Sequence, residues 1–524
     1  MSDVDRRTFL EVASLGAAAA LAAPLVFAQS APSLEELTIA ELQRFSARDL
    51  TEWYLARIDA FDKHGPAVNS IIELNPDALS IAEMLDRERK AGRSRGLLHG
   101  IPILIKDNID TADRMHTTAG SLALADSIAA RDAHVVRRLR EAGAVLLGKT
   151  NLSEWANFRS THSTSGWSGR GGLTRNPYAL DRNACGSSSG TGAAIAASFA
   201  AVGVGTETDG SVVCPSSACG LVGIKPTLGL VSRTGIIPIA HSQDTAGPMA
   251  RTVTDAAILL GAMTGIDSLD AITANSRAHV HADYTKFLDP NGLRGARIGV
   301  ARKYFGINDH VDKLMNAALD VLKQLGATLV DPADMETTGK YDDTELEVLL
   351  YEFKADLNAY LAALPPNVRV RSLADVIRFN EEHRDREMPY FGQELLERAE
   401  KKGPLTSPEY RKALAKNHRL SRAEGIDATL KKHKLDALVA PTGGPVWCTD
   451  LVNGDHYTGG YSSASAVAGY PHITVPAGQA FGLPVGLSFF AGAWSEPALL
   501  KFAYAFEQAT KARRAPKYPP SAAA

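Results

Sequence analysis

The most constraining feature of this sequence is the alternation, along most of its length, of short β-branched apolar runs with segments of helical periodicity. Such alternation is typical of α/β domains. No internal repeat, low-complexity tract or Pro/Ser linker interrupts it, so we predict one continuous domain with a charge-rich helical insertion at about 305–432. Helices are expected at 34–63, 77–92, 133–142, 192–202 and 252–263, and strands at 97–105, 144–147, 204–206, 298–300, 435–440, 472–475 and 485–490.

Length and composition leave several classes open and exclude others. The 524 residues would allow two or three domains at roughly 150 residues each. With 45% hydrophobic and 22% charged residues the chain is globular rather than disordered. The net charge of −3 gives no basic excess, so nucleic acid is not an expected partner.

The first 28 residues have the three parts of an export signal. Arg6 and Arg7 precede an Ala-rich apolar stretch, and the sequence from Val26 to Ala28 suits signal peptidase. This resembles a twin-arginine signal, which makes the export machinery a transient partner and the protein periplasmic or secreted. The stretch is too short for a permanent membrane span, and no other is long and apolar enough. The folded domain is then expected at 29–524.

Four cysteines in a chain of this length cannot form a disulfide framework. Twin-arginine export follows cytoplasmic folding, so no disulfide should be required for the fold. Buried thiols are the default expectation, and a bridge formed after export stays open. The four cysteines are Cys185, Cys214, Cys219 and Cys448. No Cys/His spacing indicates zinc, and we expect neither a metal nor a cofactor.

Two motifs match sequence patterns that are typical of known enzyme classes. Residues 143–150 match the Walker A spacing, but the four variable positions are Ala, Val, Leu and Leu, which suit a strand better than a phosphate loop. Residues 186–190 match a nucleophile elbow with Ser188 in the centre, but the preceding 178–185 cannot form the apolar strand that an elbow needs. We therefore reject nucleotide binding and the α/β-hydrolase fold.

Three other segments carry chemistry together. Lys106 ends the apolar run Gly100-Ile-Pro-Ile-Leu-Ile-Lys106-Asp-Asn108, where desolvation can lower its pKa. The loop Cys185-Gly-Ser187-Ser-Ser-Gly-Thr-Gly192 brings hydroxyls and bare backbone together. The turn Gly205-Thr-Glu-Thr-Asp-Gly-Ser211 presents successive N–H groups, the material of an oxyanion hole. Taken singly, each is ordinary: a surface lysine, a linker and a turn.

In this order and spacing the three segments resemble the amidase signature family. Its Gly/Ser-rich core would run from about Asn176 to Thr227, and its C-terminal pattern appears in 468–476 and 482–487. The resemblance covers nearly the whole mature chain and is strongest to the peptide amidase branch, which removes C-terminal amides from peptides. It implies the amidase signature fold, a central mixed, twisted sheet covered by helices.

Carried over to this sequence, the resemblance implies a Ser–cis-Ser–Lys triad. Ser211 would be the nucleophile, Ser187 the bridging serine after a cis peptide bond, and Lys106 the general base. The N–H groups of residues 208–211 (Thr208, Asp209, Gly210 and Ser211) would hold the oxyanion, with Ser188, Asn108 and Glu207 supporting the site. The amide would be cleaved to acid and ammonia through an acyl-enzyme. His162 and His241 are expected to be structural, because this mechanism needs no imidazole.

The sequence departs from the wider family at three positions, where Glu207, Asp209 and Val213 replace the usual Asp, Gly and Arg. Loss of the arginine argues against anionic amides as substrates, and Asp209 could accept a hydrogen bond from a substrate N–H. Tyr351, Phe353 and Tyr360 could line a substrate channel or belong to the core. Alternatives are a broad aryl/alkyl amidase or esterase, the glutamine-hydrolysing subunit of a tRNA-dependent amidotransferase, and a catalytically silent binding protein.

Overall fold

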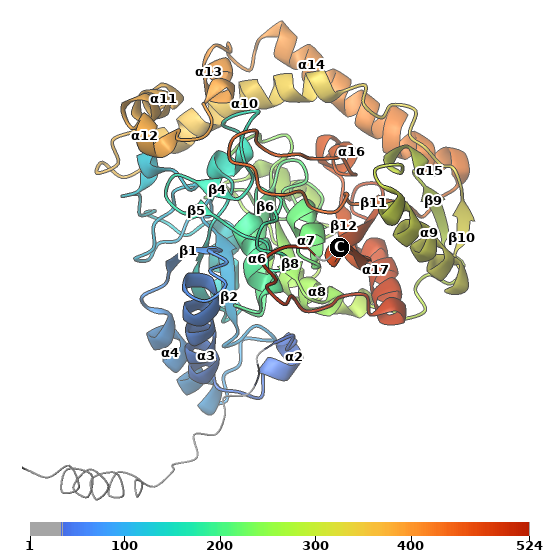
Figure 1. The fold of residues 1–524 in the computed structure, drawn as a ribbon, viewed down its shortest axis with the longest axis horizontal. Helices are drawn as coiled ribbons and strands as arrows, with labels where there is room; N and C mark the ends of the chain where they lie inside the picture. Colours follow the sequence, from blue (N-terminus) through green and yellow to red (C-terminus); the bar gives the residue numbers. More distant parts are fainter. Residues whose placement is uncertain (1–32, 34, 523–524) are drawn as a thin grey trace, which may run out of the picture. The chain divides into compact units, whose positions relative to one another are not determined.

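The computed structural model describes residue 33 and residues 35–522; the predicted export signal lies outside the described residues. One sheet of eleven strands forms the centre of the described fold, in the order β1-β3-β2-β6-β8-β7-β12-β13-β11-β9-β10. It extends from β1 on the left of Figure 1 to β10 on the right. Its strands are β1 (Ile71–Leu74), β2 (Pro102–Lys106), β3 (Val145–Thr150), β6 (Val202–Glu207), β7 (Val222–Lys225), β8 (Thr245–Ala250), β9 (Arg297–Val300), β10 (Thr328–Val330), β11 (Ala437–Pro441), β12 (His472–Ala480) and β13 (Leu483–Phe490). A small two-stranded sheet pairs β4 (Trp167–Ser168) with β5 (Gly172–Leu173).

The large sheet is mixed, as predicted. β2 runs parallel to both β3 and β6, and β9 runs parallel to both β10 and β11. The strands between these two groups pair antiparallel: β8 lies between β6 and β7, and β12 between β7 and β13. From Glu35 onward, the described residues form one compact unit, which confirms the prediction of a single α/β domain.

Helices cover the sheet. The α-helices are α2 (Ile39–Leu42), α3 (Ala47–Ile58), α4 (Ala78–Lys90), α5 (His134–Glu141), α6 (Ser189–Ala196), α7 (Val213–Ala218), α8 (Val253–Met263), α9 (Asp309–Gln324), α10 (Asp342–Ala362), α11 (Leu373–Glu382), α12 (Arg384–Glu387), α13 (Glu394–Glu400), α14 (Pro408–His418), α15 (Asp427–His433), α16 (Ser463–Ala468) and α17 (Glu496–Thr510). α10, α13 and α14 lie together at the top of Figure 1. No helix of the described residues is long and apolar enough to cross a membrane.

Several predicted elements have different bounds. The helix expected at 34–63 is divided into α2, α3 and a π-helical turn (Asp59–Lys63), because Ser46 caps a new helix. The Ala-rich helix begins at Ser189 rather than at 192. The strands β1, β7, β8 and β10 were not predicted. β8 contains Gly247 and Pro248, residues that normally argue against a strand.

The structure confirms the rejection of both imitated motifs. Residues 145–150 of the Walker-like segment form strand β3, and the Lys149 side chain is buried, donating hydrogen bonds to the Ile109 carbonyl and the Thr117 hydroxyl. It is therefore not available to a phosphate. No strand precedes Ser188 in the region 178–185; Ser188 instead stands at the start of α6.

Candidate active site

Lys106 lies at the carboxyl end of β2, with its side chain completely buried. Its Nζ donates to the Ser187 hydroxyl at 2.7 Å and to the Thr206 hydroxyl at 2.9 Å. Burial lowers the pKa of Lys106 to about 7, against the opposing charges of Asp244 and Glu207. Neutral Lys106 is therefore well populated near neutral pH, and it faces the serine that was predicted to bridge to the nucleophile.

Ser187 begins the segment that leads into α6, and the peptide bond between Gly186 and Ser187 is cis, as the resemblance implied. The next residue connects this segment to the predicted nucleophile, because the Ser188 N–H donates to the Ser211 carbonyl at 3.2 Å. The Ser188 hydroxyl also donates to the Thr206 carbonyl at 3.0 Å. The two serine-bearing segments are thus held side by side at the end of β6.

Ser211 lies in the turn between β6 and α7, 8% exposed. The turn is tight: Gly210 has a φ of +78°, a conformation that favours glycine. The Glu207 carboxylate accepts the N–H groups of Val212 and Val213 at 2.8 and 3.0 Å and so holds the start of α7. Burial raises the pKa of Glu207, while the Lys225 ammonium opposes that shift.

The backbone before Ser211 offers free donors. Within the described part of the chain, no hydrogen bond uses the N–H of Asp209, Gly210 or Ser211. Buried N–H groups without acceptors are rare in folded proteins, and at a reactive serine they are the donors from which an oxyanion hole is built. The geometry therefore suits the role that the sequence predicts for residues 208–211.

The Asp209 carboxylate lies among polar side chains. Its Oδ2 accepts from the Ser463 hydroxyl at 2.6 Å. Burial and the nearby Asp209 charge raise the pKa of the Glu345 carboxyl well above its usual value. The hydrogen bond from a substrate N–H to Asp209 stays a prediction.

Three residues of the site lie outside the predicted set. Thr206 receives hydrogen bonds from both Lys106 and the Asn108 side chain, which donates at 3.0 Å. Asp244 accepts from the Thr208 hydroxyl at 2.6 Å, and the Gln243 side chain donates to the Thr208 carbonyl at 3.3 Å. Thr206 could have been found inside the motif 205–211. Nothing in the local sequence around Gln243 and Asp244 marks them.

A cavity of about 380 Å³ adjoins this region. Its lining includes Asn108, Thr206, Thr208, His241 and Asp356. Lys106, Ser187 and Ser211 are not among its lining residues in the described chain. The cavity therefore reaches the segment before the nucleophile rather than the three triad positions themselves.

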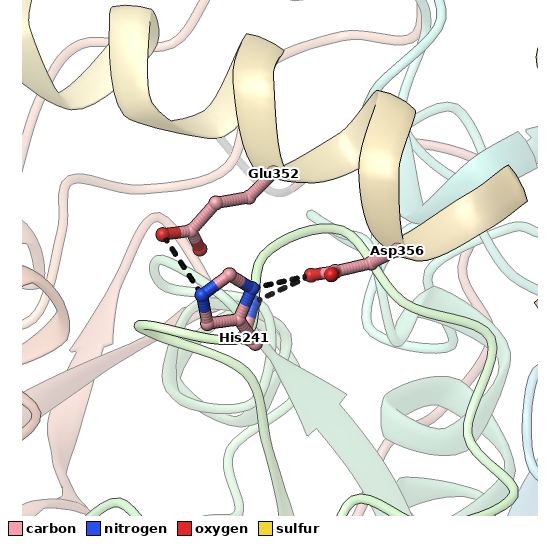
Figure 2. A group of neighbouring side chains, drawn as sticks. All are labelled: His241, Glu352 and Asp356. Atoms are coloured by element: carbon pink, nitrogen blue, oxygen red, sulfur yellow. Dashed lines mark hydrogen bonds and ion pairs between the residues drawn. The ribbon is translucent and has the colours of Figure 1, made fainter. Parts of the chain in front are cut away.

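His241 lies between two carboxylates of α10 (Figure 2). Its Nδ1 is 2.8 Å from Asp356 Oδ2, and its Nε2 is 3.5 Å from Glu352 Oε1. Burial lowers the pKa of His241, but the hydrogen bond to Asp356 and both carboxylate charges outweigh it and raise the pKa. These three residues are the only potential metal-ligand group among the described residues. Because the two ring nitrogens face different carboxylates, the arrangement suits a protonated imidazole rather than a metal ion.

The aromatic residues of the insertion divide between core and polar contacts. Phe353 is completely buried in a hydrophobic cluster with Leu350 and Phe158. Tyr351 packs against Tyr410, and the Tyr360 hydroxyl donates to Asp110. Of the two histidines expected to be structural, His241 holds α10, whereas His162 is exposed on a loop.

A disulfide joins Cys185 to Cys214, so the default expectation of buried thiols is wrong for these two residues. Cys219 is a buried free thiol, and Cys448 is free and exposed. The bridge connects the segment just before Ser187 to the helix just after Ser211. Cross-linking residues separated by 29 positions stabilises a fold by about 3–4 kcal/mol, mainly by restricting the unfolded chain. The sequence spacing alone could not reveal this pair, because the distance between the two cysteines depends on how α6 and α7 pack together.

Comparisons with known proteins agree with this geometry. A family model described as Amidase matches residues 49–500. The structure of native peptide amidase from Stenotrophomonas maltophilia is 52% identical, covers 93% of this chain and 99% of that one, and has a TM-score of 0.87. A protein of Arabidopsis thaliana described as a probable amidase is 43% identical over 97% of this chain and 95% of its own. One subunit of a glutamyl-tRNA(Gln) amidotransferase, from Halorhodospira halophila, is 35% identical over 91% of this chain and 98% of its own.

Proposed function

This chain belongs to the amidase family, and we propose that it hydrolyses the C-terminal amide of peptides through Ser211, Ser187 and Lys106. The observation that carries the mechanism is the 2.7 Å contact between the buried Lys106 amine and the Ser187 hydroxyl, beside the turn that bears Ser211. The peptide substrate is supported by the 52% identity to the S. maltophilia peptide amidase, whose fold this chain shares.

In the proposed reaction, neutral Lys106 takes a proton from Ser187, which takes one from Ser211. The Ser211 oxygen attacks the amide carbon, and the N–H groups of residues 208–211 stabilise the negative oxygen. Ser187 then returns a proton to the departing nitrogen, so that ammonia leaves and an ester to Ser211 remains. Water, activated through the same serine and lysine, cleaves this ester to the acid and restores Ser211.

Mass spectrometry of a peptide amide incubated with the protein tests the substrate class. We expect the C-terminal amide to be converted to the acid while every internal peptide bond stays intact. The matched probes are glutamine, an aryl amide and an ester. Turnover confined to glutamine would replace the proposal with an amidotransferase function, and turnover confined to aryl amides or esters with a broad hydrolase function. If none of the probes is turned over, a catalytically silent binding protein would replace the proposed function.

We also propose that the protein is exported through the twin-arginine route and acts in the periplasm or outside the cell. The Arg6-Arg7 pair and the apolar stretch that follows it support this. The Cys185–Cys214 bridge supports it as well, because disulfides persist in oxidising compartments.

Replacing Arg6 and Arg7 by lysine should keep the protein in the cytoplasm, with an uncleaved N-terminus. Cell fractionation and N-terminal sequencing measure this; the unchanged chain should begin near Gln29 outside the cytoplasm. An unchanged distribution of the lysine variant would contradict the proposed route.

A further inference from the structure

We propose that helix α10 positions the oxyanion-binding turn by holding the loop at residues 239–244, with Gln243 and Asp244 as the positioning residues. The inference rests on the proposed function, because it takes residues 208–211 as the oxyanion site. It assigns a role in the reaction to part of the helical insertion, which lies far from Ser211 in the sequence.

Three acids of α10 share one face of the helix. Glu352 and Asp356 follow Glu345 by 7 and 11 residues, close to two and three turns of an α-helix. Each acid contacts a different residue of the loop. The Gln243 side chain donates to Glu345 at 2.9 Å, the Ser242 N–H to Glu352 at 2.9 Å, and the His241 N–H to Asp356 at 3.1 Å. The His241 ring strengthens the last contact by reaching both Glu352 and Asp356 (Figure 2).

The loop at residues 239–244 also holds Thr208, the first residue of the oxyanion-binding turn. Two hydrogen bonds hold Thr208: its hydroxyl donates to Asp244 Oδ1, and its carbonyl accepts from the Gln243 side chain. The other oxygen of Asp244 accepts the N–H groups of Ile239 and Ala240 at 2.8 and 2.9 Å, so Asp244 is itself oriented by the loop. A displacement of the loop must therefore move Thr208.

Burial makes this chain of contacts stiff. Gln243 is 1% exposed and Glu352 is completely buried, its second partner being the Tyr410 hydroxyl at 2.7 Å. In a water-excluded setting, hydrogen bonds are strong and an unpaired polar group is strongly destabilising, so breaking the contacts of Gln243 and Glu352 is costly. Glu345 adds an electrostatic link, because the side chain that accepts from Gln243 is also near Asp209, whose charge helps to raise the pKa of Glu345.

Oxyanion donors act only when they already point to where the negative charge develops. Loss of one such donor costs about 10²–10³ in kcat, and smaller misplacements cost less. The N–H groups of residues 209–211 belong to a turn whose first residue is held by the loop. Weakening the contacts of α10 should therefore lower kcat and leave substrate binding nearly unchanged.

Two single variants test the inference with the peptide amide assay. Asp356→Asn weakens the contact between α10 and His241 of the loop. Gln243→Met removes the side-chain donor that binds the Thr208 carbonyl. We expect kcat to fall about fivefold in the first and about thirtyfold in the second, with KM changed less than about threefold. The matched control is Glu347→Gln, which removes another ion pair of α10, to Lys402, without touching the loop. It should keep the unmodified kcat, and melting curves should show that all three variants are folded.

The double variant Asp356→Asn/Gln243→Met separates positioning from general weakening of the fold. If both residues act through Thr208, the loss in the double variant should be smaller than the product of the two single losses, whereas independent effects would multiply. Multiplying losses, or an equal loss in Glu347→Gln, would overturn the inference. If the parent protein cleaves no amide, the proposed function fails instead, so the two failures are distinguishable.

Discussion

Ser211→Ala should abolish amide hydrolysis, with a loss of about five to six orders of magnitude in kcat. The alanine variant keeps the turn and its free N–H groups, so it should still bind a peptide amide, but no acyl-enzyme can form. Ammonia release measures turnover, and intact mass after rapid acid quenching detects the ester. Only the unmodified protein should show an added acyl mass, located on the peptide that contains Ser211.

The matched control for this prediction is Ser216→Ala, in the helix that follows. The Ser216 hydroxyl is buried and has no hydrogen-bond partner among the described residues, so its removal leaves no polar group unsatisfied. Ser216→Ala should retain the parent activity. Measurable acyl-enzyme in Ser211→Ala would show that another group is the nucleophile, and an equal loss in both variants would show that the loss is not specific to the Ser211 hydroxyl.

Lys106→Met should lower kcat by about three to four orders of magnitude, because methionine fills the buried site but cannot accept a proton. In the parent protein, the pKa of Lys106 is lowered to about 7 by burial. The reactive form is the neutral amine, so kcat/KM should rise as pH increases through about 7 and level off above it. At lower pH the protonated amine cannot accept the Ser187 proton, and activity falls.

The control is a second buried lysine, Lys149, whose pKa burial also lowers but which bonds to Ile109 and Thr117 rather than to a serine. Lys149→Met should not shift the midpoint of the pH profile from about 7, even if it lowers the stability of the fold. An unchanged midpoint in the residual activity of Lys106→Met would show that a different group titrates.

Most of the strands that build the site were predictable. β2 is an apolar β-branched run that ends on Lys106, and β6 leads directly into the motif with Ser211. Both signals are local, because the buried strand and the turn after it lie in consecutive residues. The fold class followed from the same alternation, and the likeness to the S. maltophilia structure confirms the amidase signature fold.

β7 and β8 were missed for a physical reason. β8 lies between β6 and β7, where cross-strand pairing and burial override the poor strand preference of Gly247 and Pro248. β7 has only four residues, so a period of two has little room to appear. In both cases the neighbouring strands supply the stability, and those neighbours are distant in the sequence.

The sequence by itself determined the order of the chemical groups: a lysine at a strand end, a serine-rich loop, and a serine after a glycine turn. Tertiary structure alone decided what surrounds them. The Cys185–Cys214 bridge and the hold of Gln243 and Asp244 on Thr208 each join residues 29 or more positions apart. Hydrogen bonds and disulfides depend on distances of a few ångströms, which periodicity and local propensity do not specify. Those atoms come together only because α6 and α7 pack against the sheet and α10 packs against the loop at residues 239–244.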